Sequence, residues 1–176
     1  MHRPSPHVAA GVDPVPPDIL ARHRNVTLAV DIMFVNQVPF LITLSRNLRF
    51  ITVEDLPNRK ETTVRDKLLS VLRLYRHRGF NVVTVLADPE FEMLRPYIPT
   101  LNTCAADEHV PDIERTIRSV KDRVRSTHLR LPFKYLPRLI VVRLVANAVL
   151  WINALPHPLG ISNEFSPRYL LLGRDL

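Results

Sequence analysis

Alternating hydrophobic and polar positions after Val26 divide the chain into three extended runs. These runs are VTLAVDIMFV, VPFLITLSR and LRFITVEDL, and each is rich in the β-branched and aromatic residues that favour strands. Asn36-Gln37 and Arg46-Asn47 separate the runs, and both polar pairs suit tight turns. Three successive strands joined by short turns predict an antiparallel meander.

The pattern then changes to helical spacing. Apolar residues recur every three or four positions from Val64 to Tyr75, between threonines at 62–63 that suit a helix start and Gly79, which suits a helix end. The strand NVVTVLAD, ending at Asp88, comes next. A strand, a helix and a strand require a crossover that sets the second strand parallel to a neighbour, so the sheet is predicted to be mixed.

The remaining elements complete a recognisable order. PEFEMLRP predicts a short helix, LNTCA a short fifth strand, residues 111–127 an amphipathic helix, and the segment after Pro137 a last long helix. The inner stripe of the amphipathic helix is Ile113, Ile117, Val120 and Val124. This is the element order of the ribonuclease H-like fold. We therefore expect an α/β domain with a mixed sheet of about five strands, three antiparallel and then parallel, flanked by helices.

The two ends of the chain differ from this middle. Residues 1–25 are rich in proline and contain no uninterrupted apolar run, which predicts a flexible linker and argues against a secretory signal. We expect the folded core at 26–155 and a C-terminal extension with a short helix at 156–176. The total of 176 residues suits one domain with a sizeable core.

Charge narrows the class of partner. The chain has 24 Lys and Arg against 17 Asp and Glu, a net charge of +7 that favours nucleic acid or an anionic membrane surface. The apolar stretch 139–155 is nearly long enough for a bilayer, but an arginine at the centre of a span costs about 2.5–3.5 kcal/mol. Because Arg143 interrupts the stretch, a buried helix is favoured. The single cysteine, Cys104, excludes an internal disulfide or a cysteine-based zinc site and suits a reducing compartment.

Three acidic residues stand where metal chemistry would need them. Asp31 lies within the apolar first strand, where an unpartnered carboxylate is costly to bury, and Asp88 ends a strand directly before Pro89. Glu114 lies in the first turn of the amphipathic helix, which could lie over the sheet edge. Two-metal phosphoryl chemistry uses carboxylates that converge from separate segments, and Mg²⁺ prefers oxygen ligands.

Each carboxylate also has an ordinary alternative. Asp31 could bond a neighbouring backbone group, Asp88 could be turn chemistry, and Glu114 with Arg118 forms a common exposed pair that stabilises a helix by ~0.2–0.5 kcal/mol. The conjunction of all three within a matching fold favours the metal hypothesis. Arg118, Lys121 and Arg125 follow Glu114 at i+4, i+7 and i+11, which predicts a basic ridge for a phosphate backbone.

Several motifs together resemble the integrase core of copia-type long-terminal-repeat retrotransposon polyproteins, over about Val26 to Arg174. VDIMFV and VLADPEFEML are similar to the two aspartate strands of that family, and EHVPDIERTIRSVKDRVRS to its glutamate helix. AVLWINALPHPLGISNEFSPRYLLLGR resembles its late helix, Leu-Pro turn and Ser-Pro segment. The resemblance implies catalytic, metal-holding roles for Asp31, Asp88 and Glu114, with Arg115 beside the glutamate as a DNA contact.

The chain also departs from that family. Pro89-Glu90 replaces an Asn-Gly-Gly run, the 26-residue interval from Asp88 to Glu114 is short, and the upstream zinc-binding module is missing. Asp107 and Glu108 are rivals for the role of Glu114, and His109 suits a loop residue without a special role.

The resemblance implies a DNA-joining polynucleotidyl transferase that trims 3′ ends and transfers strands with two Mg²⁺ or Mn²⁺ ions. The implied partners are element and target DNA and further copies of the chain, without a membrane, in the nucleus or a cytoplasmic retroelement particle. The alternatives are an inactive or domesticated core that binds DNA or a protein, and a ribonuclease H-like endonuclease.

Overall fold

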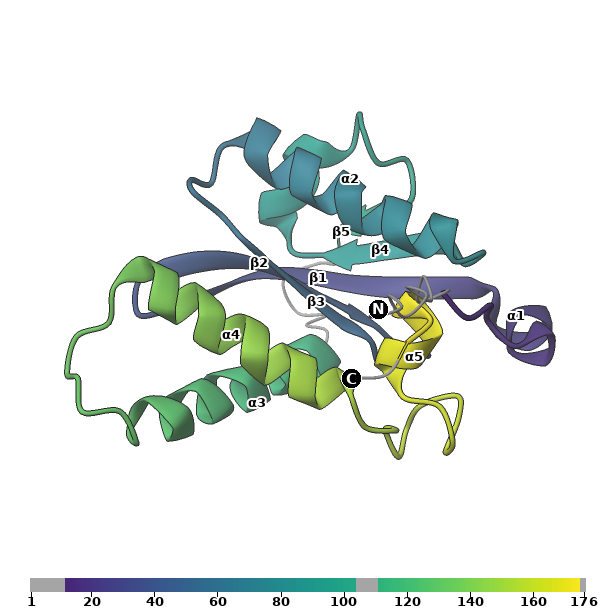
Figure 1. Ribbon diagram of the computed structural model, residues 1–176. Helices are drawn as coiled ribbons and strands as arrows, with labels where there is room; N and C mark the ends of the chain where they lie inside the picture. The colour runs from purple at the N-terminus through teal and green to yellow at the C-terminus, as the bar shows by residue number, and fades with distance from the viewer. Residues whose placement is uncertain (1–11, 104–110, 175–176) are drawn as a thin grey trace, which may run out of the picture.

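A mixed sheet forms the centre of the computed structural model, which describes residues 12–103 and 111–174. The strand order is β3-β2-β1-β4-β5 (Figure 1). β1 pairs antiparallel with β2 and parallel with β4, while β2–β3 is antiparallel and β4–β5 parallel. The sheet confirms the predicted fold class. The strands are β1 (Asn25–Val35), β2 (Val38–Ser45), β3 (Ile51–Asp55), β4 (Asn81–Ala87) and β5 (Leu101–Thr103).

Helices cover both faces of this sheet. α2 lies on one face, and α3 and α4 lie on the other (Figure 1). We call these the α2 face and the α3 face. The helical elements are α1 (Pro17–His23), α2 (Glu61–His77), the 3₁₀ helix η1 (Pro89–Leu94), α3 (Pro111–His128), α4 (Arg138–Asn153) and α5 (Pro167–Leu172).

The alternation of β1 assigns its residues to the two faces. Leu28 and Val30 belong to the hydrophobic cluster that contains the buried side chains of α2. Ala29 and Met33 belong to the second cluster, with the buried side chains of α3 and α4. Because successive strand residues point to opposite faces, Asp31 points to the α3 face.

Two local features fix the antiparallel half of the sheet. Asn36 and Gln37 both have positive φ, 45° and 65°, as the two-residue hairpin turn between β1 and β2 requires. At the far end of α4, the buried Asn153 side chain accepts a hydrogen bond from the Ile51 N–H (2.9 Å) and donates one to the Ile51 carbonyl (2.7 Å). These two hydrogen bonds anchor the end of α4 to β3.

The predicted linker at 1–25 was wrong over its described part. Pro17 occupies the first turn of α1, a position that tolerates proline because its missing N–H would have no helical partner. Val15 and Ile19 are buried in the α2-face cluster, and the Asp13 N–H donates to the Gly173 carbonyl at 2.9 Å. The fold therefore begins before Val26 and includes this segment.

The C-terminal residues also belong to the fold. α5 is the short helix expected after residue 156, and its Leu170 and Leu171 are buried in the α2-face cluster. Within residues 12–103 and 111–174, no helix is both long and apolar enough to span a membrane. The apolar segment that raised this alternative forms α4, whose Val141 and Val145 are buried on the α3 face.

Candidate active site

Asp31 lies within β1, next to Asp88, which directly follows the carboxyl end of the parallel strand β4. The last register pair between β1 and β4 is Val30 with Ala87, so each aspartate is the next residue along its strand. Neighbouring strands lie about 4.8 Å apart. Leu86 pairs with Ala29, a residue of the α3 face, and by the same alternation Asp88 follows on the side of the sheet where Asp31 lies.

Glu114 approaches this position from α3. Its neighbour Ile113 is buried in the α3-face cluster, which fixes the first turn of the helix against the sheet. α3 packs against both β1 and β2. Glu114 itself is exposed, so its side chain lies at the surface.

The electrostatic state of Asp31 connects these elements. Burial raises the pKa of Asp31 to about 6, against the lowering effect of a hydrogen bond from the Ile32 N–H. The negative charges of Asp88, Glu90 and Glu114 raise it further. Asp88 and Glu114 of the predicted trio therefore both lie within electrostatic reach of Asp31.

Glu90 is a fourth acidic residue near Asp31, in addition to the three that the sequence predicted. It follows Asp88 by two residues in η1, and its charge adds to the pKa of Asp31. Its signal in the sequence is the Pro89-Glu90 pair, where the chain departs from the family pattern. Because Pro89 turns the chain into a 3₁₀ helix at the end of the strand, Glu90 stays near the aspartates.

The donor set suits a divalent cation in its chemistry. Carboxylate oxygens are the ligands that Mg²⁺ prefers, and repulsion among acidic groups is relieved by a cation. As the side chains stand, however, the described ranges contain no group of three or more His, Cys, Asp and Glu that could hold a metal ion. The carboxylates therefore share an electrostatic environment without forming a preassembled cage.

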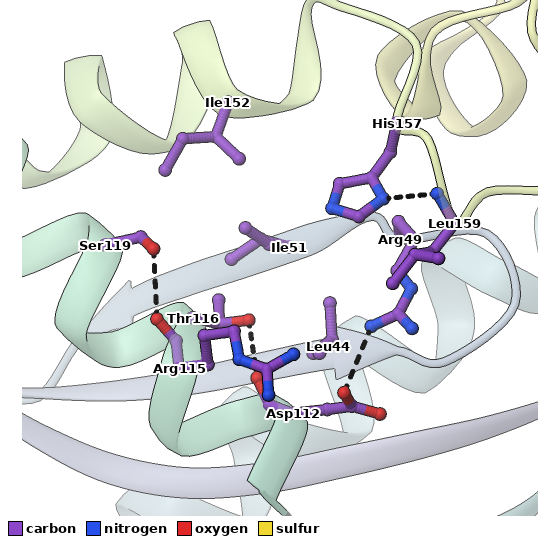
Figure 2. Close-up of a pocket in the computed structure, with 10 residues that line it drawn as sticks. All are labelled: Leu44, Arg49, Ile51, Asp112, Arg115, Thr116, Ser119, Ile152, His157 and Leu159. Atoms are coloured by element: carbon purple, nitrogen blue, oxygen red, sulfur yellow. Dashed lines mark hydrogen bonds and ion pairs between the residues drawn. The ribbon is translucent and has the colours of Figure 1, made fainter.

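The predicted DNA contacts lie on two flanks of α3. Helical geometry sets Arg118, Lys121 and Arg125 on the flank of Glu114, and Arg125 donates to Asp122 at 2.9 Å. Arg115 instead lines a cavity between α3 and the antiparallel strands (Figure 2). The rival acids Asp107 and Glu108, and His109, lie outside the described residues.

These features define an α/β domain with the ribonuclease H-like fold of integrase catalytic cores. The chain is similar to the crystal structure of the catalytic core domain of BIV integrase, with a TM-score of 0.58 and 15% sequence identity. The similarity covers 83% of this chain and 93% of that one. No family model matches the sequence, and no curated protein matches it. At this identity the likeness establishes the fold.

Proposed function

We propose that this chain is the catalytic core of an integrase-type polynucleotidyl transferase of the copia-type retrotransposon kind. The observation that carries the proposal is the placement of Asp31 and Asp88 side by side, with Glu114 within electrostatic reach. In open α/β sheets, sites form at the carboxyl ends of strands. The BIV integrase core has the same fold, which supports the reaction class by analogy.

Asp31, Asp88 and Glu114 are the proposed holders of Mg²⁺ or Mn²⁺, and Glu90 lies close enough to assist. Bound divalent cations would supply Lewis acidity at the scissile phosphate and activate the attacking group. The chain's own contribution is to hold the two aspartates on neighbouring strands, which limits their motion. Glu114 comes from a helix packed on the same sheet, and its charge reaches Asp31.

The basic ridge of Arg118, Lys121 and Arg125 is the proposed track for a DNA backbone. Arg118 and Lys121 have no ion pair with any other described residue, so their charges are available for phosphate. Contacts of this kind position a duplex without reading its sequence. We therefore expect loose target preference and strong dependence on salt.

Self-association is proposed from the outer surface of α4. Leu139 and Trp151 are 64% and 51% exposed there, and Leu155 just after the helix is 65% exposed. Trp151 therefore does not pack against the sheet. Exposed apolar side chains gathered on one element suit contact with a second copy. Sedimentation velocity should show an oligomer that Trp151→Glu dissociates and Met93→Glu, on η1, leaves intact; an unchanged profile for Trp151→Glu would count against this surface.

The substrate comparison tests the reaction class. Purified protein should be supplied with Mn²⁺ and either a DNA duplex with a recessed 3′ hydroxyl or an RNA–DNA hybrid. Joining of the DNA end to a second duplex supports the transferase. Hydrolysis of the hybrid without joining would instead assign a ribonuclease H-like nuclease.

A second candidate is an inactive or domesticated core that binds DNA without cutting it. Two observations favour it: no assembled metal-holding group exists among residues 12–103 and 111–174, and the Asp88–Glu114 interval is short. This candidate predicts DNA binding that is unchanged by Mn²⁺. It also predicts no joining at any metal concentration.

A further inference from the structure

A cavity of about 210 Å³ lies on the flank of α3 away from the basic ridge. Its floor is the antiparallel half of the sheet, and its other walls are α3, the end of α4 and the turn that contains His157 (Figure 2). The lining residues include Leu44, Ile51, Ile152 and Leu159 as apolar walls. Polar groups converge from the other side, from Arg49, Asp112, Arg115 and His157.

Positive charge exceeds negative charge at this cavity. Asp112 is the acidic residue of the lining, and it faces Arg49 at 3.6 Å and Arg46, outside the lining, at 3.9 Å. Both distances are longer than the 2.7–2.9 Å or so of a charge-assisted hydrogen bond. Arg115 lines the same cavity and has no ion pair within the part of the chain that the structure describes.

Arg49 is the least satisfied of these groups. Its side chain is 15% exposed, and its Nε is buried without a hydrogen-bond partner among the described residues. A buried donor without an acceptor is uncommon, so Arg49 is not fully satisfied by the described residues. The Arg49 backbone has φ 58°, a left-handed conformation that is unusual for arginine and is held by its N–H bond to the Ser45 carbonyl.

His157 adds a directed donor. The Leu159 N–H donates to His157 Nδ1 at 3.0 Å, which leaves the proton of the neutral ring on Nε2. Burial, and then the charge of Arg49, lower the pKa of His157 against the raising effect of Asp112, and this lowering favours the neutral ring. The Gly160 N–H donates to the His157 carbonyl at 2.8 Å, which fixes the turn and the position of the ring.

We propose that this cavity binds a small organic anion whose oxyanion group lies between Arg49 and Arg115 and whose apolar body packs against Ile51 and Ile152. Guanidinium groups bind carboxylates and phosphates through paired hydrogen bonds, and His157 Nε2–H supplies a further donor. The volume is below the roughly 300 Å³ at which drug-sized sites begin, so the ligand is about the size of one aromatic ring. The apolar walls exclude a bare inorganic ion as the best fit.

Binding of 4-fluorobenzoate, followed by ¹⁹F NMR without DNA or metal, tests this site separately from the proposed enzyme. Wild-type protein should bind 4-fluorobenzoate at least about tenfold more tightly than the neutral 4-fluorobenzamide. Arg49→Gln should weaken benzoate binding by about tenfold or more. Arg46→Gln is the matched control, because Arg46 also faces Asp112 but does not line the cavity, and it should bind like wild type.

Ile152→Trp gives an independent variant that fills the apolar end and keeps both arginines; it should abolish binding even if Arg49→Gln fails to fold. Comparing the affinity for 4-fluorophenyl phosphate with that for 4-fluorobenzoate shows whether the site prefers a phosphate or a carboxylate. Equal binding of benzamide and benzoate, or unchanged benzoate binding in folded Arg49→Gln or Ile152→Trp, would overturn the proposal. Displacement of benzoate by single-stranded DNA in an Arg49-dependent manner would also overturn it, because the site would then be a backbone contact.

Discussion

Buried polar groups behave differently in the two halves of the sheet. In the antiparallel half, Thr43 and Thr52 bond each other at 2.7 Å, and Asn153 satisfies both backbone groups of Ile51. Where the carboxyl end of β4 lies beside the middle of β1, Asp31 is partly buried within electrostatic reach of three further acidic groups. The threonine pair and Asn153 are satisfied within the chain and are structural, whereas the proposed function balances the acidic groups with a cation from outside.

The largest expected effect comes from removing one of the two neighbouring aspartates, Asp31 and Asp88. Asp31→Asn and Asp88→Asn should each reduce DNA joining by about a thousandfold or more, because metal-assisted stabilisation of the transition state contributes several kcal/mol. Initial rates of strand transfer at saturating Mn²⁺ measure this. Asp66→Asn, an exposed aspartate on α2, is the matched control and should keep full activity.

The next largest effect comes from removing the hydrogen bonds of Asn153 in the antiparallel half of the sheet. Asn153→Leu should lower the free energy of unfolding by about 3 kcal/mol, because it leaves two backbone groups of Ile51 without partners. For a chain of this size the melting temperature should fall by roughly 6–12 °C. Asn147→Leu, at an exposed position of the same helix, should change it little. Equal effects of the two variants would show that the anchor is not structural.

A smaller effect on the free energy of unfolding is expected at Asp31, where substitution should stabilise the protein, in contrast to substitution of Asn153. Its folded-state pKa of about 6 lies above the ordinary value of 3.8, so between these values the folded protein binds more protons than the unfolded chain. The free energy of unfolding should therefore fall as the pH rises from about 4 to about 6, by on the order of 2 kcal/mol. Asp31→Asn should remove this fall and melt several degrees higher than wild type at pH 7 with a chelator present. If Asp31→Asn is no more stable than wild type at pH 7, the burial of Asp31 among acidic groups does not destabilise the folded protein.

The smallest effect concerns the basic ridge. Arg118→Gln should weaken DNA binding and reduce the slope of log affinity against log salt by about one. Arg125→Gln should reduce it less, because Asp122 already holds that side chain at 2.9 Å. Fluorescence anisotropy over a salt series measures the slopes. Arg123→Gln, on the other flank of α3, should leave the slope unchanged if the ridge is the track.

Local patterns predicted most of the architecture. The period-two runs gave the three antiparallel strands, and helical spacing gave α2, α3 and α4 with bounds within a few residues. Asn36-Gln37 predicted its turn because both residues are polar and lie between two apolar runs. These features depend on neighbours in the sequence, which is why a single chain reveals them.

Features that depend on distant contacts were missed. The prolines around α1 predicted a linker. Val15 and Ile19 are nevertheless buried, because they pack in one cluster with residues of α2 and α5 that are distant in sequence. The role of Asn153 has no local signal, because its bonding partner lies in β3, 102 residues away in sequence. The trio Asp31, Asp88 and Glu114 was predicted from their joint occurrence in a matching fold and from the family resemblance. Glu90 was not predicted, because its position depends on the turn that begins at Pro89.

Calorimetric titration of Mn²⁺ at pH 6.5 into wild type, Asp31→Asn, Asp88→Asn and Asp66→Asn addresses the two neighbouring aspartates most directly. Saturable binding to wild type and Asp66→Asn, lost in Asp31→Asn and in Asp88→Asn, is the expected result. Binding to wild type should also release protons, since Asp31 is still partly protonated near its pKa of about 6. Equal Mn²⁺ affinity in all four proteins, or no binding to wild type, would show that these carboxylates do not hold a catalytic metal.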